Sequence, residues 1–284
     1  MKIGVSISNY GQVPNREFLI NAAKHVEENQ LDSIWVSDHI IMPKENSPWT
    51  RVFESITTLG FFASITEKIQ LGTSILIVPL RNPMILAKQI ATLDSLSGGR
   101  IIMGVGIGWN RSEFNIVGKN FGSRNKIIQE NVAIMRKLWQ GEYAKEGLIS
   151  EPLPISNNGP PILVGGQSEA ALKRVTLFGD GWHPSGITQQ EYESGIQKIT
   201  NNNNKKYIWS LRIGFAANKN VESHFTGPDG NLRLRLTGDI DKIITEIEKF
   251  ENVGLEHIVC DIREESQEEC IKQIDNLGNI RKSF

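Results

Sequence analysis

Residues 69–106 read IQLGTSILIVPLRNPMILAKQIATLDSLSGGRIIMGVG and contain one complete strand–helix–strand unit. The continuous apolar run Ile69–Val78 predicts a strand that is buried on both faces. Pro83 suits the first turn of a helix, which we expect over Pro83–Ser97, and Arg100–Gly106 predicts the next strand. Two buried strands joined by one helix are typical of a parallel sheet.

The same unit recurs along the chain. The first four predicted strands begin at residues 2, 33, 69 and 100, so the intervals between them are 31, 36 and 31 residues. A strand followed by a helix, repeated eight times, is typical of a closed parallel barrel. We therefore predict an α/β fold, a (β/α)8 TIM barrel that forms a single domain over residues 1–284. The predicted strands are Lys2–Ser8, Ser33–Ser37, Ile69–Val78, Arg100–Gly106, Pro161–Gly165, Gly181–Pro184, Ile208–Ala216 and His257–Ile262. The predicted helices are Arg16–Asn29, Phe53–Thr66, Pro83–Ser97, Asn125–Trp139, Ser168–Phe178, Thr188–Thr200, Asp239–Val253 and Ser266–Leu277.

Two longer gaps interrupt this regular spacing. The fourth and fifth strands begin 61 residues apart, which predicts an insertion after strand 4, at Gly141–Gly159, a stretch rich in Pro, Gly and Asn. A second insertion, after strand 7, is expected at Asn218–Thr237. An open, doubly wound sheet could also hold eight strands, but no Gly-x-Gly-x-x-Gly follows the first strand to support it.

The composition argues against several classes of protein. The chain has 31 Lys and Arg against 32 Asp and Glu, a formal net charge of -1, which does not favour a nucleic-acid-binding surface or a polybasic membrane segment. It has no uninterrupted apolar run of 18 residues, so we expect no membrane span. Cys260 and Cys270 are too few for a disulfide framework or a four-cysteine zinc site, and we expect no bound metal. The N-terminal apolar run ends too early for a signal peptide, so we expect a cytoplasmic protein.

Candidate catalytic residues follow the second and fourth strands. In a barrel of this type the functional side chains lie at the carboxyl ends of the strands. Asp38 and His39 come directly after the second strand, and a histidine there can donate a hydrogen bond or move a proton near neutral pH. The alternative is structural, with Asp38 as a helix cap and His39 in a buried hydrogen bond. Glu113 follows the fourth strand and either faces the cavity or lies in solvent or at a helix cap.

Glycines mark the third, fourth and fifth strands. Gly72 lies inside the third strand and indicates a bulge or a close backbone approach, although a plain buried strand is the alternative. Gly104, Gly106 and Gly108 alternate along the end of the fourth strand and leave space that a flat aromatic ring would fit. Residues 165–168, Gly-Gly-Gln-Ser, lead into a predicted helix whose free backbone N–H groups suit a phosphate; a simple turn with a helix cap is the alternative.

In this order and spacing, the motifs resemble those of the bacterial luciferase-like flavin and deazaflavin oxidoreductases, whose fold is a (β/α)8 barrel. The resemblance covers Lys2 to about Ser185 and becomes weaker beyond. Ser37-Asp38-His39 resembles the coenzyme F420-dependent branch of the family rather than the FMN-dependent one. The motifs that carry the resemblance are Trp35–His39, Leu71–Ile75, Arg81–Pro83, Leu93–Arg100, Gly104–Trp109, Val164–Gly166 and Gly179–Trp182.

The resemblance implies an oxidoreductase that transfers a hydride between coenzyme F420 and a small organic substrate, and that forms a homodimer. His39 would donate or accept the accompanying proton, with Glu113 as the second candidate catalytic residue, and Asp38 would fix the tautomer of His39 or cap the next helix. A non-proline cis peptide is implied between Ser74 and Ile75, in a bulge that supports the ring. The implied cofactor-binding residues are Asp38, His39, Ser74, Ile75, Gly106, Gly165, Gly166, Gln167 and Ser168, of which the last four would hold the phosphate.

One position departs from the family pattern. Some F420-dependent sugar-phosphate dehydrogenases have a catalytic Glu directly after the fourth-strand Gly-x-Gly, where this chain has Trp109. The resemblance therefore does not extend to sugar-phosphate oxidation. Two other functions fit the same barrel: an FMN-dependent monooxygenase that activates O2, and a flavin-binding protein without catalytic activity.

Overall fold

The eight predicted strands form a closed parallel barrel. The computed structural model describes residues 1–44, 49–201, 205–227 and 229–284. The barrel strands pair in parallel in chain order, and the last strand pairs with both the first and the seventh, which closes the ring. They are β1 (Lys2–Ser6), β2 (Ser33–Val36), β3 (Gln70–Ile77), β4 (Ile101–Gly106), β5 (Ile162–Gly165), β6 (Gly181–His183), β7 (Ile208–Ala217) and β10 (His257–Ile262). The predicted (β/α)8 architecture is confirmed.

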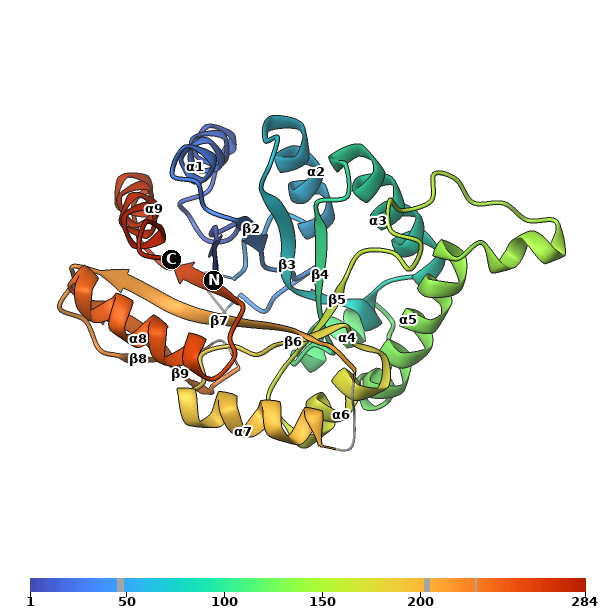
Figure 1. Ribbon diagram of the computed structural model, residues 1–284. Coiled ribbons are helices and arrows are strands. Elements are labelled where there is room, and N and C mark those ends of the chain that lie inside the picture. Colours follow the sequence, from blue (N-terminus) through green and yellow to red (C-terminus); the bar gives the residue numbers. More distant parts are fainter. Residues whose placement is uncertain (45–48, 202–204, 228) are drawn as a thin grey trace.

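All eight predicted helices are present and surround the barrel (Figure 1). Helix α3 begins as expected, with Pro83 in its first turn and Oδ1 of Asn82 accepting hydrogen bonds from the next free N–H groups. The last helix continues past its predicted end because Ile280 also belongs to the buried core. The helices are α1 (Arg16–Glu28), α2 (Ser55–Ile65), α3 (Pro83–Ser97), α5 (Arg124–Trp139), α6 (Glu169–Phe178), α7 (Gln189–Thr200), α8 (Ile240–Asn252) and α9 (Gln267–Arg281). Short elements that the sequence did not predict are η1 (Val78–Leu80), α4 (Arg111–Ile116) and η2 (Phe121–Ser123).

The insertion expected at Gly141–Gly159 projects from the barrel beside α3 and α5 (Figure 1). It begins with the short 3-10 helix η3 (Glu142–Glu146) and then continues without regular structure to β5. Oδ2 of Asp94 accepts a hydrogen bond from the backbone N–H of Ile155 at 2.9 Å, which ties the end of the insertion to α3.

The second insertion forms a hairpin. Strands β8 (His224–Thr226) and β9 (Leu232–Gly238) pair antiparallel, and β9 also pairs in parallel with the second half of β7. The predicted location at Asn218–Thr237 is confirmed, and the two strands inside it are an additional finding. Because β9 extends the end of β7, the hairpin brings residues 229–233 to the carboxyl end of the barrel.

Below the carboxyl end, apolar side chains that pack around Trp35 fill the barrel interior. Its ring contacts a buried cluster with Ile102, Leu163 and Val259. Gly72 makes this possible, since a Cβ at that position would lie 2.4 Å from the Trp35 ring. The predicted close approach at Gly72 is therefore confirmed. Side chains therefore fill the interior at this level, and a cavity lies at the carboxyl end of the barrel.

Two buried histidines predict a fold that is sensitive to acid. Burial lowers the pKa of His183 and of His257 to about 3, with positive neighbours such as Arg212 adding to the effect at His183. An unfolded chain binds these protons near pH 6.5, so between pH 6.5 and 3 the unfolded state holds more protons and stability falls as the pH falls. Each histidine contributes a slope of about 1.4 kcal/mol per pH unit.

Urea unfolding at pH 7, 6, 5 and 4 measures this effect. We expect the free energy of unfolding to decrease steeply below pH 6, and a His257→Gln variant to show about half of the wild-type slope. A free energy of unfolding that stays constant from pH 7 to pH 4.5 would contradict the prediction. His224 is exposed, so His224→Gln serves as the control and should leave the slope unchanged.

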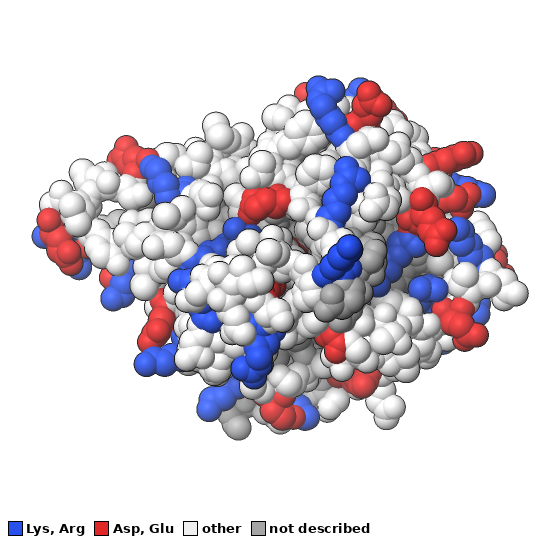
Figure 2. Space-filling model, turned by 180° about the vertical axis from the view of Figure 1, so that it is seen from behind, with Lys and Arg blue, Asp and Glu red and all other residues white. Residues whose placement is uncertain are grey.

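Charges are mixed over the surface. On the face shown in Figure 2, Lys and Arg side chains are interspersed with Asp and Glu side chains. Among the described residues, no helix combines the length and the apolar character needed to cross a bilayer.

Candidate functional site

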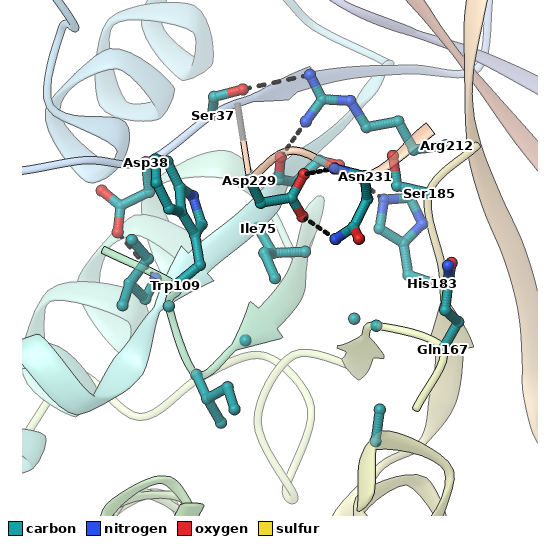
Figure 3. Close-up of a pocket in the computed structure, with 18 of the residues that line it drawn as sticks. Ser37, Asp38, Ile75, Trp109, Gln167, His183, Ser185, Arg212, Asp229 and Asn231 are labelled. Atoms are coloured by element: carbon teal, nitrogen blue, oxygen red, sulfur yellow. Dashed lines mark hydrogen bonds between the residues drawn. The ribbon is translucent and has the colours of Figure 1, made fainter. Parts of the chain in front are cut away.

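A cavity of about 420 Å³ opens at the carboxyl ends of the barrel strands. A volume of this size is typical of small-molecule and cofactor sites. Figure 3 shows side chains from several strand ends and from the hairpin pointing into it. Of the residues proposed from the sequence, those that line it are Asp38, His39, Ser74, Ile75, Gly106, Gly165, Gly166, Gln167 and Ser168. Glu113 lies directly behind His39 and does not itself line the cavity.

The floor of the cavity is the bulge in β3. The pairing of β3 with β4 shifts register between Thr73 and Leu76, and the peptide bond between Ser74 and Ile75 is cis, as implied by the family resemblance. A Cβ at Gly106 would lie 1.9 Å, and one at Gly165 2.8 Å, from Cδ1 of Ile75. We expected a flat ring to use the space beside the fourth-strand glycines; instead, Ile75 fills it, and Ile75 itself faces the cavity.

Neighbouring strands hold the bulge from below. Nε2 of His183 lies 2.9 Å from Oγ of Ser74, and Nδ1 of His183 lies 2.8 Å from Oγ of Ser210. The His183 ring also stacks on Trp35 at 4.7 Å between ring centroids. Arg212 donates a hydrogen bond from Nη1 to the backbone carbonyl of Ser74. Because each of these groups is buried and hydrogen-bonded, the floor is rigid.

His39 and Glu113 form a buried pair at one side of the cavity. Nδ1 of His39 lies 3.1 Å from Oε2 of Glu113, and the two side chains are 7% and 0% exposed. Oε1 of Glu113 accepts a hydrogen bond from the backbone N–H of Ile40 at 2.6 Å. Since the carboxylate is the acceptor in these contacts, Nδ1 is the protonated ring nitrogen, which leaves Nε2 as the acceptor. Nε2 of His39 has no partner among the described residues.

Two tryptophans flank the His39 ring. The ring of Trp49 meets it edge-on at a centroid distance of 5.7 Å, and that of Trp109 does so at 5.8 Å. Both tryptophans line the cavity. The His39 ring therefore contacts two indole rings, and its Nδ1 contacts the Glu113 carboxylate.

Asp38 supports the site rather than His39. Its Oδ1 accepts hydrogen bonds from Oγ of Ser55 at 2.9 Å and from Nη2 of Arg81 at 2.6 Å. Its Oδ2 accepts a hydrogen bond from the backbone N–H of Ile77 at 2.9 Å, and its side chain is fully buried. The expectation that Asp38 fixes the tautomer of His39 is wrong, because Glu113 occupies that position. The alternative expectation, that Asp38 caps the next helix, is also wrong, because Glu54 is the N-cap of α2.

The start of α6 forms the opposite side of the cavity. Gly166 has a φ of +94°, a conformation that favours glycine, and Ser168 is the N-cap of α6 as predicted. Arg174, six residues after Ser168, lines the cavity and is only 4% exposed. Its Nη1 donates to Oδ1 of Asn125 at 2.7 Å, but its buried Nε has no hydrogen-bond partner.

Two further arginines raise the positive charge behind Arg174. Arg111 and Arg124 both lie over the Phe121 ring, at 4.4 and 3.7 Å from its centroid. Burial, with the charge of Arg124, lowers the pKa of Arg174, and burial, with the charge of Arg111, lowers that of Arg124. Within the described residues no carboxylate pairs with any of the three. A phosphate on the amide groups of residues 165–168 would supply the missing negative charge, so these residues fit a phosphorylated cofactor.

A second group of charged side chains, Arg212, Asp261 and Arg263, lies next to the bulge that forms the floor of the cavity. Asp261 accepts hydrogen bonds from Arg212 and from Arg263, each at 2.8 Å. Although burial opposes its ionisation, these two guanidinium groups lower the pKa of Asp261 to about 2. Asp261 is therefore a carboxylate at neutral and mildly acidic pH, and its hydrogen bond to Arg212 keeps that side chain under the bulge.

Several residues of this site were not predicted from the sequence. Arg212 stands in the middle of the apolar run of β7, where a charged residue indicates a special role, and this signal was available. Arg174 lies on the buried side of α6 with Ala171, Leu172 and Val175, which is the same kind of signal. The pairing of His39 with Glu113 joins residues 74 positions apart, and no local pattern marks it.

Comparison with known proteins gives a family match and several relatives. Residues 1–208 match the family model described as luciferase-like monooxygenase. An F420-dependent glucose-6-phosphate dehydrogenase from Amycolatopsis mediterranei (strain U-32) is 34% identical over 179 residues, which cover 58% of this chain and 52% of that protein. An uncharacterised protein from Mycobacterium tuberculosis is 29% identical over 183 residues, which cover 57% of this chain and 65% of that protein. The chain thus spans less than two thirds of the length of both relatives.

Solved structures share the fold along the whole chain. An F420-dependent secondary alcohol dehydrogenase in complex with an F420–acetone adduct superposes with a TM-score of 0.78 at 18% identity, covering 98% of this chain and 97% of that one. The oxygenating constituent of 3,6-diketocamphane monooxygenase from Pseudomonas putida, in complex with FMN, gives a TM-score of 0.77 at 14% identity over the same shares of the two chains. At these identities the likeness establishes a common fold.

Proposed function

Because the chain belongs to the luciferase-like monooxygenase family, we propose that it is an oxidoreductase that binds coenzyme F420 and transfers a hydride between this cofactor and a small organic substrate. The proposal depends on one observation: two chemically different groups line opposite sides of the same cavity. A histidine paired with a buried carboxylate lies on one side, and Arg174, which has no carboxylate partner within the described residues, lies on the other. The F420-dependent relative supports the choice of cofactor.

The residues of the chain fit the cofactor in two places. The amide groups of residues 165–168 and the guanidinium of Arg174 would hold the phosphorylated tail, and Ile75 would support the ring from below. When bound, coenzyme F420 supplies a carbon centre, C5 of its deazaflavin ring, that accepts or donates a hydride. The protein then has to orient the reactants and to donate or accept the proton that accompanies the hydride.

His39 lies where it could donate or accept that proton. With Nδ1 held by Glu113, Nε2 is the nitrogen available to a substrate hydroxyl or carbonyl oxygen. In the oxidation of an alcohol, Nε2 would take the O–H proton, and the bound cofactor would accept the hydrogen of the C–H bond as a hydride. In the reverse direction, Nε2 returns the proton to the carbonyl oxygen. Glu113 stabilises the positive charge that the imidazole ring carries while it holds this proton.

A cofactor titration tests the proposal directly. We expect the purified protein to bind coenzyme F420, seen as a saturable change in the absorbance of the deazaflavin, and to bind FMN more weakly. Binding of FMN without binding of F420 would refute the assignment, and oxygen consumption with reduced FMN would then identify a monooxygenase. Binding without turnover over a broad substrate panel would identify a flavin-binding protein without catalytic activity.

Arg174→Gln tests where the phosphate binds. Loss of one charge-assisted hydrogen bond is worth about 1.5–3 kcal/mol, so we expect the affinity for F420 to fall by about 10- to 100-fold. Lys173→Gln removes a positive charge from the neighbouring, exposed position and should change the affinity by less than about twofold. Equal affinities for F420 in the two variants would show that the tail binds elsewhere.

A further inference from the structure

Two aromatic side chains beside His39 have no part in the proposed proton transfer. Trp49 precedes α2 and Trp109 follows β4, and both line the cavity. Figure 3 shows Trp109 among the side chains at the cavity. The planes of the two indole rings make angles of 77° and 82° with the plane of the His39 ring. A substrate oxygen bound at Nε2 of His39 therefore has indole rings close to it, and so does the carbon that carries this oxygen.

Tyr10 fixes the position of Trp49. The two rings stack at 3.8 Å between centroids, with their planes 17° apart, and Tyr10 is only 6% exposed. The backbone next to Trp49 is anchored to the loop after β1, because the N–H of Gly11 donates to the carbonyl of Arg51 at 2.9 Å. Since both the ring and its backbone are held by protein contacts, Trp49 is preorganised for a ligand.

The backbone before Trp109 is fixed as well. Gly108 has a φ of +75°, a conformation that favours glycine. A Cβ at this position would lie 2.8 Å from Cγ2 of Ile77 and 2.8 Å from Cε2 of Phe114. A larger residue at position 108 would have to displace these side chains. The chain therefore turns in one way at Gly108, and Trp109 lines the cavity directly after this turn.

Isoleucine side chains form the cavity wall next to the two tryptophans. Ile75 and Ile77 on β3 and Ile107 after β4 line the cavity here. Asp38 also lines it, but both of its carboxylate oxygens already accept hydrogen bonds from protein donors. A polyhydroxylated substrate would leave hydroxyl groups without partners against this wall, which weakens binding, whereas an apolar group gains from burial. The substituent on the reacting carbon is therefore expected to be apolar.

The charge of the cavity argues against a cation beside the two indole rings. Aromatic rings also bind quaternary ammonium groups, so the rings alone do not decide between a cation and an uncharged ring. The Glu113 carboxylate is already paired with His39 and is not free to neutralise a cation. The described residues that line the cavity include four arginines, Arg174, Arg212, Arg233 and Arg263, and two aspartates, Asp38 and Asp229. An uncharged aromatic ring fits both the walls and this excess of positive charge.

We propose that the substrate is an aryl alcohol, or the aryl aldehyde or ketone formed from it, whose flat ring contacts Trp49 and Trp109. This inference rests on the proposed function, in which Nε2 of His39 binds the substrate oxygen. Because both indole rings contact His39 itself, the aromatic ring is attached directly to the carbon that carries the oxygen. In the oxidation, the C–O bond becomes a carbonyl double bond, Nε2 accepts the O–H proton, and the hydride passes to the bound cofactor. Trp49 and Trp109 are then the residues that determine specificity.

Titration calorimetry with two matched alcohols tests this inference without any need for turnover. Benzyl alcohol and cyclohexylmethanol have the same carbon skeleton, but only benzyl alcohol has a flat ring with π electrons. Burial of apolar surface alone favours cyclohexylmethanol, which has the larger apolar area, whereas contacts with indole rings favour benzyl alcohol. We expect the wild-type protein to bind benzyl alcohol at least about fivefold more tightly than cyclohexylmethanol, both without cofactor and with F420 bound.

Variants of the two tryptophans locate the bound ring. Trp49→Leu and Trp109→Leu keep an apolar side chain but remove the indole ring, and each should reduce the preference for benzyl alcohol to less than about twofold. Trp109→Phe keeps an aromatic ring and should retain most of the preference. Trp209→Leu is the matched control, since Trp209 lies near the amino end of β7 and does not line the cavity, and it should leave the preference unchanged.

Three results would overturn the proposal: equal or weaker binding of benzyl alcohol by the wild-type protein, a preference that persists in both leucine variants, or tighter binding of tetramethylammonium than of benzyl alcohol. The last result would identify a site for cations. Failure of the wild-type protein to bind F420 refutes the proposed function separately, because the titrations without cofactor still measure the preference. Thermal midpoints equal to that of Trp209→Leu confirm that the leucine variants are folded. If Trp49→Leu does not fold, Trp109→Leu and Trp109→Phe decide the outcome.

Discussion

Replacement of His39 by glutamine is expected to lower kcat by about 10²- to 10⁴-fold while the affinity for the cofactor stays within about threefold of wild type. Glutamine keeps a polar side chain of similar reach but cannot hold a proton at the position of Nε2. In the proposed function the cofactor tail binds at the start of α6, three strands from the end of β2, so we expect its affinity to depend little on His39. Turnover followed by the absorbance of coenzyme F420, together with a direct binding titration, measures both quantities.

The control and a second variant make this result specific. His224→Gln changes an exposed histidine on β8 and should leave kcat unchanged. Added imidazole should restore part of the activity of His39→Ala, since a free imidazole can carry the proton in the space left by the side chain. Glu113→Gln should lower kcat and also shift the pH dependence of kcat, because Glu113 acts through His39. A His39→Gln enzyme with more than a third of wild-type activity would exclude a role in proton transfer.

Asp261→Asn is expected to lower the free energy of unfolding by about 3–5 kcal/mol. Among the residues that the structure describes, this carboxylate is the only negative charge in contact with Arg212, which is 6% exposed, so its loss leaves a buried guanidinium uncompensated. The same change removes one of the contacts that keep Arg212 under the bulge, and the floor of the cavity should lose rigidity. Urea unfolding at pH 7 measures the change in stability.

A surface ion pair provides the comparison for Asp261. Glu246 and Lys249 pair on the exposed face of α8 at 2.6 Å, and Glu246→Gln should cost less than about 0.5 kcal/mol. The difference between the two variants isolates the effect of burial on a charge. A loss below about 1 kcal/mol in Asp261→Asn would show that water or another acceptor reaches Arg212.

The barrel could be predicted because buried parallel strands appear in a sequence as continuous apolar runs. Strand β9 was missed although Leu232, Leu234 and Leu236 alternate with two arginines, a period of two that predicts a half-buried strand. Helix α4 was missed because six residues are too few to show a helical period. Insertions that carry short elements of this kind are the parts of the fold that a search for regular βα units overlooks.

The candidate site was predicted where its residues lie just after strands, as Asp38, His39 and Gly166 do. What could not be predicted is which side chains meet across the barrel mouth. Asp38 was the expected partner of His39, and Glu113 was a second candidate catalytic residue. The three-dimensional arrangement instead assigns Glu113 to His39 and Asp38 to Arg81. Contacts of this kind depend on side-chain direction at the ends of different strands, which the spacing along the sequence does not determine.

The fit of Ile75 into the space beside Gly106 and Gly165 has a consequence for how such proteins diverge. Any side chain at position 106 would need the volume that Cδ1 of Ile75 now occupies. Positions 75, 106 and 165 lie on three different strands. A larger side chain at one of them requires a smaller side chain at another, so we expect substitutions at these positions to occur together. A directed-evolution library that varies position 75 alone samples only smaller residues, whereas one that varies positions 75, 106 and 165 together can reshape the floor.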